Sequence, residues 1–239
     1  LSELNRMLTA LSLETVSVWL GGQSAAQLKR VEEADLIVSL PYGRAAARRL
    51  AAASGARLVE TELPFGLPKT MRFLRDVGEA AGMEREAEAF IDAELSDVIP
   101  RLKWIIPQYF LNRKTGFMGD PHLFAGFLDI AQDLGMSVAG AIVRGRGKHA
   151  ASADGVPVLY EPPVFSDEVR RLLETPVDLF VSCWCEQEWP QLRSPSMEFG
   201  FPSYRHHALS DRPFLGFNGF LAFVDRMSGE LSRRRAIHG

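Results

Sequence analysis

The stretch DLIVSLPYGRAAARRLAAASGARLVET, residues 35–61, decides the fold class. Residues 35–40 form a short apolar run of the kind that is buried on both faces in a parallel sheet, and residues 57–61 form a second such run. Between them, the alanine-rich residues 43–55 favour a helix that ends at Gly55. A strand, a helix and a strand in this order require parallel strands joined by a right-handed crossover.

The alternation continues on both sides of this stretch. Residues 2–12 predict a helix, TVSVWL at 15–20 predicts a strand, and Ser24 can cap a helix over 25–34. The first lobe is thus a βαβαβ unit in which residues 35–40 are expected to form the central strand.

After the loop ELPFGLPKT (62–70), a helix is expected over 69–81. The loop lacks the pattern of a phosphate-binding loop, so a rigid loop that seats this helix is the favoured interpretation. A long helical stretch then covers 83–110, where Pro100 and Pro107 are expected to kink or break it.

The pattern then restarts, which predicts a second lobe. Its expected helices lie at 121–135, 166–175 and 215–232, and its expected strands lie at 115–119, 136–145, 157–161 and 178–184, the last one central. The sequence predicts an α/β protein with two Rossmann-like lobes, each a parallel sheet flanked by helices, and a cleft between them. The expected domains are a first lobe at 1–85, a helical connector at 86–112 and a second lobe with a C-terminal helix at 113–239.

Composition excludes several classes of protein. The chain is 46% hydrophobic and 24% charged, with a net charge of −3, which gives no reason to expect a nucleic acid or an anionic membrane as partner. No apolar run approaches the roughly 18 residues that span a bilayer. The two cysteines, Cys183 and Cys185, are too close in sequence for good disulfide geometry, so reduced thiols and a cytoplasmic location are expected.

Ligands of open parallel sheets bind at the carboxyl ends of the strands. This rule selects five stretches as candidate sites, namely residues 21–24, 39–43, 62–70, 119–122 and 182–187.

Two of these stretches carry candidate ligand groups. In GDPH (119–122), backbone amides and His122 could face an anion or a cofactor. A helix start with Asp120 as N-cap and Pro121 at the first helical position explains the motif by itself and is the favoured interpretation. Cys183 and Cys185 point to the same face of a strand and could contribute to a metal site, although plain buried thiols are the simpler interpretation.

A third candidate is the stretch GFPSYRHHALSDRPFLGFNG, residues 200–219, which follows the last expected strand. His206 and His207 could ligate a metal or move protons, or they could be two solvated histidines of a loop. Periodicity and spacing go no further than an α/β protein of two lobes with sites at the sheet edges.

Four stretches in order resemble the nitrogenase component 1 family, which includes nitrogenase molybdenum–iron protein subunits, their cofactor-assembly scaffolds, and the dark-operative protochlorophyllide and chlorophyllide reductases. These stretches lie at 55–82, 116–136, 177–182 and 200–227. The last of them is most similar to the β-type subunits, in which Gly-Phe-Pro, a basic–His–His cluster and a Gly-aromatic-x-Gly helix start keep similar spacing.

The resemblance has consequences for the site. In the family a cysteine-bearing domain precedes the two lobes, so this chain is expected to match the last two of three domains. The α-type subunit has a cofactor-ligating cysteine near the position of Ser39 and a cofactor histidine near His206. Serine is a poor ligand for iron, and Arg-His-His also occurs in β-type chains that hold no such cofactor. The resemblance therefore favours a β-type or assembly-type subunit.

The resulting hypothesis is a subunit of a nitrogenase-like oxidoreductase that receives electrons from an ATP-dependent iron–sulfur reductase and reduces a small-molecule or tetrapyrrole substrate. Its partner would be a paralogous subunit or a second copy of itself. The iron–sulfur cluster would belong to the full assembly, and none is expected in this chain alone. The alternative is a small-molecule-binding or metallocofactor-assembly scaffold. The expected metal ligands are Cys183 and Cys185, and the expected cofactor-binding residues are Ser39, Tyr42, Gly119, Asp120, His122, His206 and His207.

Overall fold

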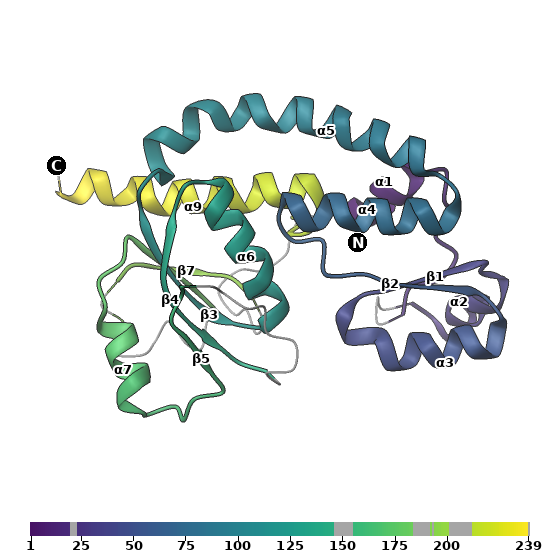
Figure 1. Ribbon diagram of the computed structural model, residues 1–239, viewed down its shortest axis with the longest axis horizontal. Helices are drawn as coiled ribbons and strands as arrows, with labels where there is room; N and C mark the ends of the chain where they lie inside the picture. The colour runs from purple at the N-terminus through teal and green to yellow at the C-terminus, as the bar shows by residue number, and fades with distance from the viewer. Residues whose placement is uncertain (20–22, 146–154, 184–191, 193, 201–211, 239) are drawn as a thin grey trace. The chain divides into compact units, whose positions relative to one another are not determined.

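The strand–helix–strand stretch forms as the sequence predicts. In the computed structural model, β1 (Leu36–Ser39) and β2 (Arg57–Glu60) pair in parallel, and α3 (Arg44–Ser54) connects them (Figure 1). Gly55 ends α3 with a φ of 78°, in the left-handed region where glycine meets no steric penalty. The carboxyl ends of β1 and β2 therefore lie at the same edge of their sheet.

The chain divides into two compact units. Unit 1 comprises Leu1–Val98 and Pro213–Phe220, and unit 2 comprises Ile99–Arg212 and Leu221–Gly239. The domain limits expected from the sequence stay a prediction. The structure describes residues 1–19, 23–145, 155–183, 192, 194–200 and 212–238.

The expected strand at residues 15–20 is wrong for the part that the structure describes, because residues 15–19 form no strand. The backbone amide of Val18 donates instead to the side-chain oxygen of Gln23, at 2.8 Å. In the described residues the sheet of unit 1 consequently has two strands, so β1 is an edge strand and not a central one.

The other helical segments of unit 1 begin and end near their expected bounds, although the predicted helix at 25–34 is α2 followed by a short 3₁₀ turn. They are α1 (Ser2–Ala10), α2 (Ala25–Lys29), η1 (Arg30–Glu33), η2 (Pro41–Gly43) and α4 (Leu67–Ala81).

The loop before α4 is mostly buried and seats the helix, as the sequence predicts. Gly66 turns the chain with a φ of 90°, and the hydroxyl of Thr70 donates to the carbonyls of Pro64 and Gly66, at 3.2 and 2.7 Å. Lys69 pairs with Glu62 at 2.7 Å. These contacts seat the start of α4 on the loop.

One long helix, α5 (Glu84–Ile105), leads from unit 1 into unit 2. Pro100 does not break the helix, since it lies inside α5 on its exposed face, where water can bind the carbonyl that lost its amide partner. The alternative, a kink at Pro100, stays a prediction. At Pro107 the helix does change, because η3 (Ile106–Phe110) is a turn of π-helix that the amide of Leu111 closes on the carbonyl of Ile106, at 3.0 Å.

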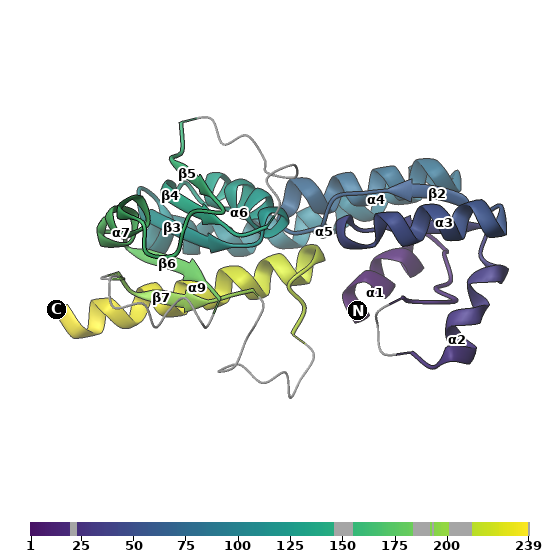
Figure 2. The ribbon, with the colours of Figure 1, turned by 90° about the horizontal axis from the view of Figure 1, so that it is seen from below.

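The described strands of unit 2 form one parallel sheet in the order β5-β4-β3-β6-β7 (Figure 2). The expected central strand, β6, lies inside the sheet between β3 and β7, but β3 is the middle strand. The sequence did not predict β7. The strands are β3 (Lys114–Gly119), β4 (Ser137–Val143), β5 (Val158–Tyr160), β6 (Leu179–Ser182) and β7 (Ser196–Glu198).

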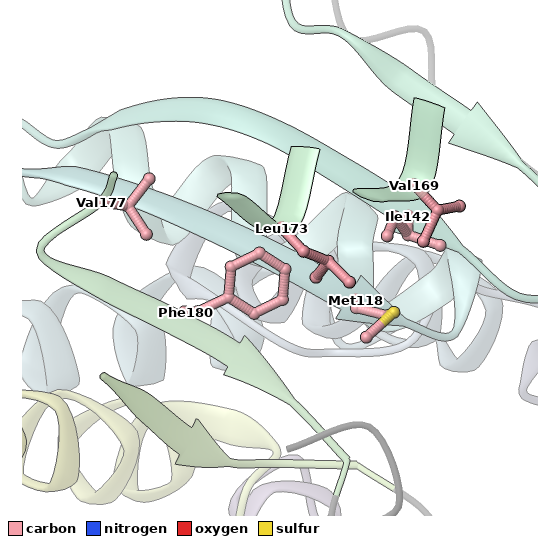
Figure 3. Packing of buried hydrophobic residues seen from close by; sticks show 6 residues of the cluster. All are labelled: Met118, Ile142, Val169, Leu173, Val177 and Phe180. Carbon is pink, nitrogen blue, oxygen red and sulfur yellow. The ribbon is translucent and has the colours of Figure 1, made fainter. Parts of the chain in front are cut away.

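Helices cover both faces of this sheet. On one face, α7 (Asp167–Glu174) packs Val169 and Leu173 onto Met118, Ile142, Val177 and Phe180, as Figure 3 shows. On the other face, α6 (Pro121–Asp133) and α9 (Gly216–His238) meet through an aromatic cluster of Phe117, Phe124, Phe127, Phe199 and Phe223. Among the described residues, no helix is both long and apolar enough to cross a membrane.

In unit 1, a buried carboxylate links three helices. Glu3 of α1 is 4% exposed and accepts hydrogen bonds from Arg6 at 2.9 and 2.8 Å. It also accepts from the backbone amide and side-chain amide of Asn218, in the first turn of α9, at 3.1 and 2.7 Å. Arg6 in turn donates to both oxygens of Glu94 in α5, at 2.6 and 2.8 Å, and lies over the ring of Phe90.

The net effect of these contacts is to lower the pKa of Glu3. Burial alone would raise it, but the hydrogen bonds from Arg6 and Asn218 together outweigh burial, so the pKa of Glu3 lies below its ordinary value. The start of α9 adds the favourable interaction of a carboxylate with the positive end of a helix dipole.

We expect Glu3→Gln to lower the free energy of unfolding by about 2 kcal/mol at neutral pH. This is less than the cost of breaking a fully buried pair, because Arg6 keeps Glu94 and is partly exposed. A depressed pKa stabilises the fold above the unfolded value of about 4.3, and this contribution disappears as the pH falls through the folded value. Urea unfolding at a series of pH values should therefore show the wild type and the variant converging in acid.

The exposed pair Arg30–Glu33 provides the control for this variant. Glu33→Gln should change the stability by less than about 0.5 kcal/mol, because exposed ion pairs contribute little. If Glu3→Gln lowered the free energy of unfolding at neutral pH by no more than Glu33→Gln does, the Glu3 carboxylate would not hold α1, α5 and α9 together.

Candidate functional site

At the carboxyl edge of unit 1, Ser39 is buried and Tyr42 is exposed. The hydroxyl of Ser39 donates to the carbonyl of Leu40 at 3.2 Å, and a Cβ built on Gly43 would lie 3.9 Å from that hydroxyl. Ser39 therefore lies below the turn that starts α3, whereas Tyr42 points into solvent. The two predicted cofactor-binding residues of unit 1 therefore differ in burial, and their role toward a cofactor stays a prediction.

Charged residues beside Ser39 hold the same edge together. Glu60, at the end of β2, accepts from Arg44 at 3.2 Å and from Arg48 at 2.6 and 2.8 Å. Arg44 also donates to the carbonyl of Thr61 at 3.1 Å. The hydrogen bond from Arg48 is the largest influence on Glu60 and lowers its pKa. Two guanidinium groups on one carboxylate leave this edge with an excess of positive charge.

In unit 2, the turn Gly119–His122 joins β3 to α6. The carboxylate of Asp120 accepts from the backbone amides of His122 and Leu123, at 2.8 and 3.2 Å, which is the N-cap arrangement that the sequence allowed. One oxygen of Asp120 therefore caps α6. A ligand-binding role for Gly119, Asp120 and His122 stays a prediction.

The exit of β4 packs against this turn. The amide of Arg144 donates to the carbonyl of Gly119 at 2.8 Å, and an added Cβ at Gly145 would come within 2.9 Å of the Pro121 ring. The amide of Gly145 donates to the carboxylate of Glu161, at the end of β5, at 2.5 Å. The ends of three strands thus meet at one edge.

Cys183 follows β6 and is buried. Gly200, which follows β7, lies beside it, since a Cβ built there would be 3.8 Å from the Cβ of Cys183 and 3.9 Å from a methyl of Leu123 in α6. The structure therefore brings Cys183 close to the first turn of α6, on the same edge as Asp120. The predicted site residues Cys185, His206 and His207 lie outside the described residues.

Sequence reasoning missed a buried polar pair on this edge. Ser182 and Glu198 are register partners at the ends of β6 and β7, and both are buried. The Ser182 hydroxyl has no hydrogen-bond partner within the described part of the chain. Arg226 of α9 donates to the carbonyl of Glu198 at 2.6 Å, and burial lowers the pKa of Arg226. The pair could have been predicted only if the short strand β7 had been recognised, because its pairing with β6 places Glu198 beside Ser182.

The described residues do not fit an iron–sulfur cluster or a metal ion. Within the described ranges, no group of three or more His, Cys, Asp or Glu side chains is placed to hold a metal. The whole sequence has two cysteines, whereas a cluster of four irons takes about four thiolates.

Two parallel α/β units, each with polar side chains at the carboxyl ends of its strands, define the class of fold. The chain belongs to the family of nitrogenase component 1 type oxidoreductases, whose model matches residues 1–232. The predicted resemblance is confirmed at this level, as are the parallel sheets flanked by helices.

Among individual relatives, the nitrogenase molybdenum-iron protein beta chain of Methanococcus maripaludis is 26% identical over 181 residues, which cover 72% of this chain and 38% of the relative. The solved structure "Nitrogenase Cp1 at pH 6.5" matches with a TM-score of 0.77 and 20% identity, over 98% of this chain and 57% of that chain. This chain therefore spans less than two thirds of the length of both relatives.

A further group of structures shares the fold alone. The periplasmic heme-binding protein RhuT from Roseiflexus sp. RS-1 in apo form matches with a TM-score of 0.56 and 14% identity, over 96% of each chain. At this identity the similarity concerns architecture and carries no ligand to this chain.

We expect Asp120→Ala to lower the free energy of unfolding by about 1 kcal/mol, because two amides at the start of α6 lose their acceptor. Asp120→Asn should keep most of the stability, since asparagine caps helices about as well as aspartate does. Urea unfolding of the three proteins measures both effects. If the asparagine variant were as unstable as the alanine variant, capping of α6 would not be the reason why Asp120 contributes to stability.

Proposed function

We propose that this chain is a subunit of a nitrogenase-like oxidoreductase that receives electrons from an ATP-dependent iron–sulfur reductase and takes part in reducing a bound substrate. The observation that supports this is the family match over residues 1–232, together with the similarity to a nitrogenase beta chain. The activity is proposed for an assembly and not for this chain alone, which spans only part of its relatives' length.

The partners follow from the same proposal. They are a paralogous subunit or a second copy, the ATP-dependent reductase, and a small-molecule or tetrapyrrole substrate, all in the cytoplasm. The proposed cofactor-facing residues stay those of the sequence prediction, which are Ser39, Tyr42, Gly119, Asp120, His122, His206 and His207, with Cys183 and Cys185 as candidate metal ligands.

An iron–sulfur cluster in such an assembly would need ligands that this sequence does not supply. Cys183 is buried at the end of β6, and Cys185 is the only other thiol in the chain. The proposed contribution of this chain is accordingly to bind and orient partner subunits and substrate, with no redox step assigned to its own side chains.

A second candidate is a metallocofactor-assembly or small-molecule-binding scaffold without catalysis. The same proposed cofactor-facing residues at the sheet edges favour it. A scaffold needs only sites at the edges of its sheets, and both units have such edges. The two candidates differ in whether an ATP-dependent reductase delivers electrons to the assembled protein.

We expect the purified chain to form no stoichiometric four-iron cluster, because two cysteines cannot supply four thiolates. Anaerobic reconstitution with iron and sulfide, followed by iron analysis and visible absorption, measures this. A stable cluster with four irons per chain would contradict the expectation and would place cluster ligands outside the cysteines.

The proposed function itself is tested by electron transfer. The chain is co-expressed with a paralogous component 1 subunit from the same genome, and the complex is mixed with the reduced iron–sulfur reductase. Oxidation of the reductase, followed by its absorbance, should require both the complex and MgATP.

A non-hydrolysable ATP analogue provides the control and should abolish the oxidation. A complex that forms but does not oxidise the reductase would favour the scaffold over the oxidoreductase.

A further inference from the structure

The chain passes between unit 1 and unit 2 at three points. Two of them lie inside continuous helices, after Val98 in α5 and after Phe220 in α9. The third lies between Arg212 and Pro213, where the described backbone forms neither helix nor strand. Irregular backbone resists bending little, so the stiffness of the connection depends on α5 and α9 at the points where they cross.

In unit 1 both crossing helices are held by side-chain contacts. The buried carboxylate network of α1 reaches Glu94 of α5 and Asn218 of α9. The ring of Phe90 in α5 also meets the ring of Phe217 in α9, edge to face, with centroids 6.2 Å apart. Glu94 and Asn218 each lie within about one helical turn of the crossing of their helix.

In unit 2 the same helices are held again after a few residues. Leu102 of α5 is 7% exposed. Phe223 of α9 packs against the rings of Phe127 and Phe199, with centroids 6.3 and 4.7 Å apart. The contacts of the two units therefore leave only a short segment of each helix between them.

The crossing segment of α5 contains a proline. Pro100 has no amide to donate to the carbonyl of Ser96, and its ring crowds that carbonyl. Ile99 is 58% exposed, and Pro100 and Arg101 are exposed as well, so burial adds little stiffness here. The missing hydrogen bond makes this turn the weakest point of α5.

In α9 a glycine lies directly before the crossing. Gly219 is required there for packing, because an added Cβ would collide with the backbone carbonyl of Phe214, just before α9. Glycine and proline are the two residues that weaken a helix interior most. Each crossing helix therefore has one of them within two residues of the point where it leaves unit 1.

We propose that α5 and α9 bend where they cross, at Pro100 and next to Gly219, and that the two crossings act as one hinge. Protein hinges consist of a few residues that absorb the change in backbone angles. Because the contacts in unit 1 hold α5 and α9 together, a bend in one helix needs a bend in the other. The proposal goes beyond the proposed function, because it requires neither a partner subunit nor electron transfer.

Pulsed electron spin resonance between two spin labels on the full 239-residue chain tests the hinge. The labels are attached through Arg49→Cys in α3 and Glu174→Cys in α7, which are exposed positions, one in each unit. Cys183→Ser and Cys185→Ser remove the native thiols. The distance distribution should be roughly twofold wider than that of a reference pair inside unit 2, at Gln132→Cys and Glu174→Cys.

Pro100→Ala should narrow the distribution between the units, because alanine restores the amide that α5 lacks. Pro163→Ala is the matched control, because Pro163 is also exposed but lies in the loop before α7, away from both crossings. This control should leave the width unchanged. Thermal unfolding should show both variants folded.

A second pair of variants loosens the helices instead. Ala222→Gly should widen the distribution, because it weakens α9 within its crossing segment. Ala89→Gly makes the same change in α5 inside unit 1, beside Phe90, where contacts on the unit 1 side hold the helix. It should leave the width as it is in the parent protein.

A parent distribution as narrow as that of the reference pair would overturn the proposal, as would an unchanged width in Pro100→Ala. Equal effects of Ala222→Gly and Ala89→Gly would overturn it too. None of these outcomes depends on reductase activity, so the electron-transfer experiment can fail or succeed independently.

Discussion

Parallel pairing is the constraint on which the rest of the structure depends. A strand can pair in parallel with the next one only if the chain crosses back over the sheet, and this returns every strand to the same edge. In unit 2 the constraint collects the ends of the described strands around the first turn of α6, where Asp120, Cys183 and the Ser182–Glu198 pair lie. Residues far apart in sequence become neighbours through this topology alone.

The sequence predicted elements whose signals are local. The structure of residues 35–61 could be predicted because each feature is an independent signal. The apolar run indicates a strand, the alanine-rich stretch a helix, and Gly55 the end of that helix. The helix cap at Asp120 could be predicted because its signal, Asp followed by Pro at a helix start, is also local.

Where the prediction was wrong or missing, the hydropathy pattern does not show the deciding contacts. Residues 15–19 have strand composition, but the amide of Val18 binds a side chain, Gln23. The strand β7 has only three residues, one of them charged, and is recognisable only by its pairing with β6. Arg6 contacts the carboxylate of Glu94, which is 88 residues away, and no periodicity of the sequence predicts such a partner. The same holds for most of the site, because burial of Ser182 and Glu198 depends on the completed sheet.

The contact between Glu3 and Asn218 has a consequence for how the protein is made. These residues are 215 positions apart, so the carboxylate of α1 receives this partner only after the residues between them have been synthesised. Most of unit 2 lies in sequence between the long and the short segment of unit 1, so it is synthesised before unit 1 is complete. Until Asn218 is synthesised, the Glu3 carboxylate lacks part of its partners, and elongation at roughly 5–20 residues per second sets how long this lasts.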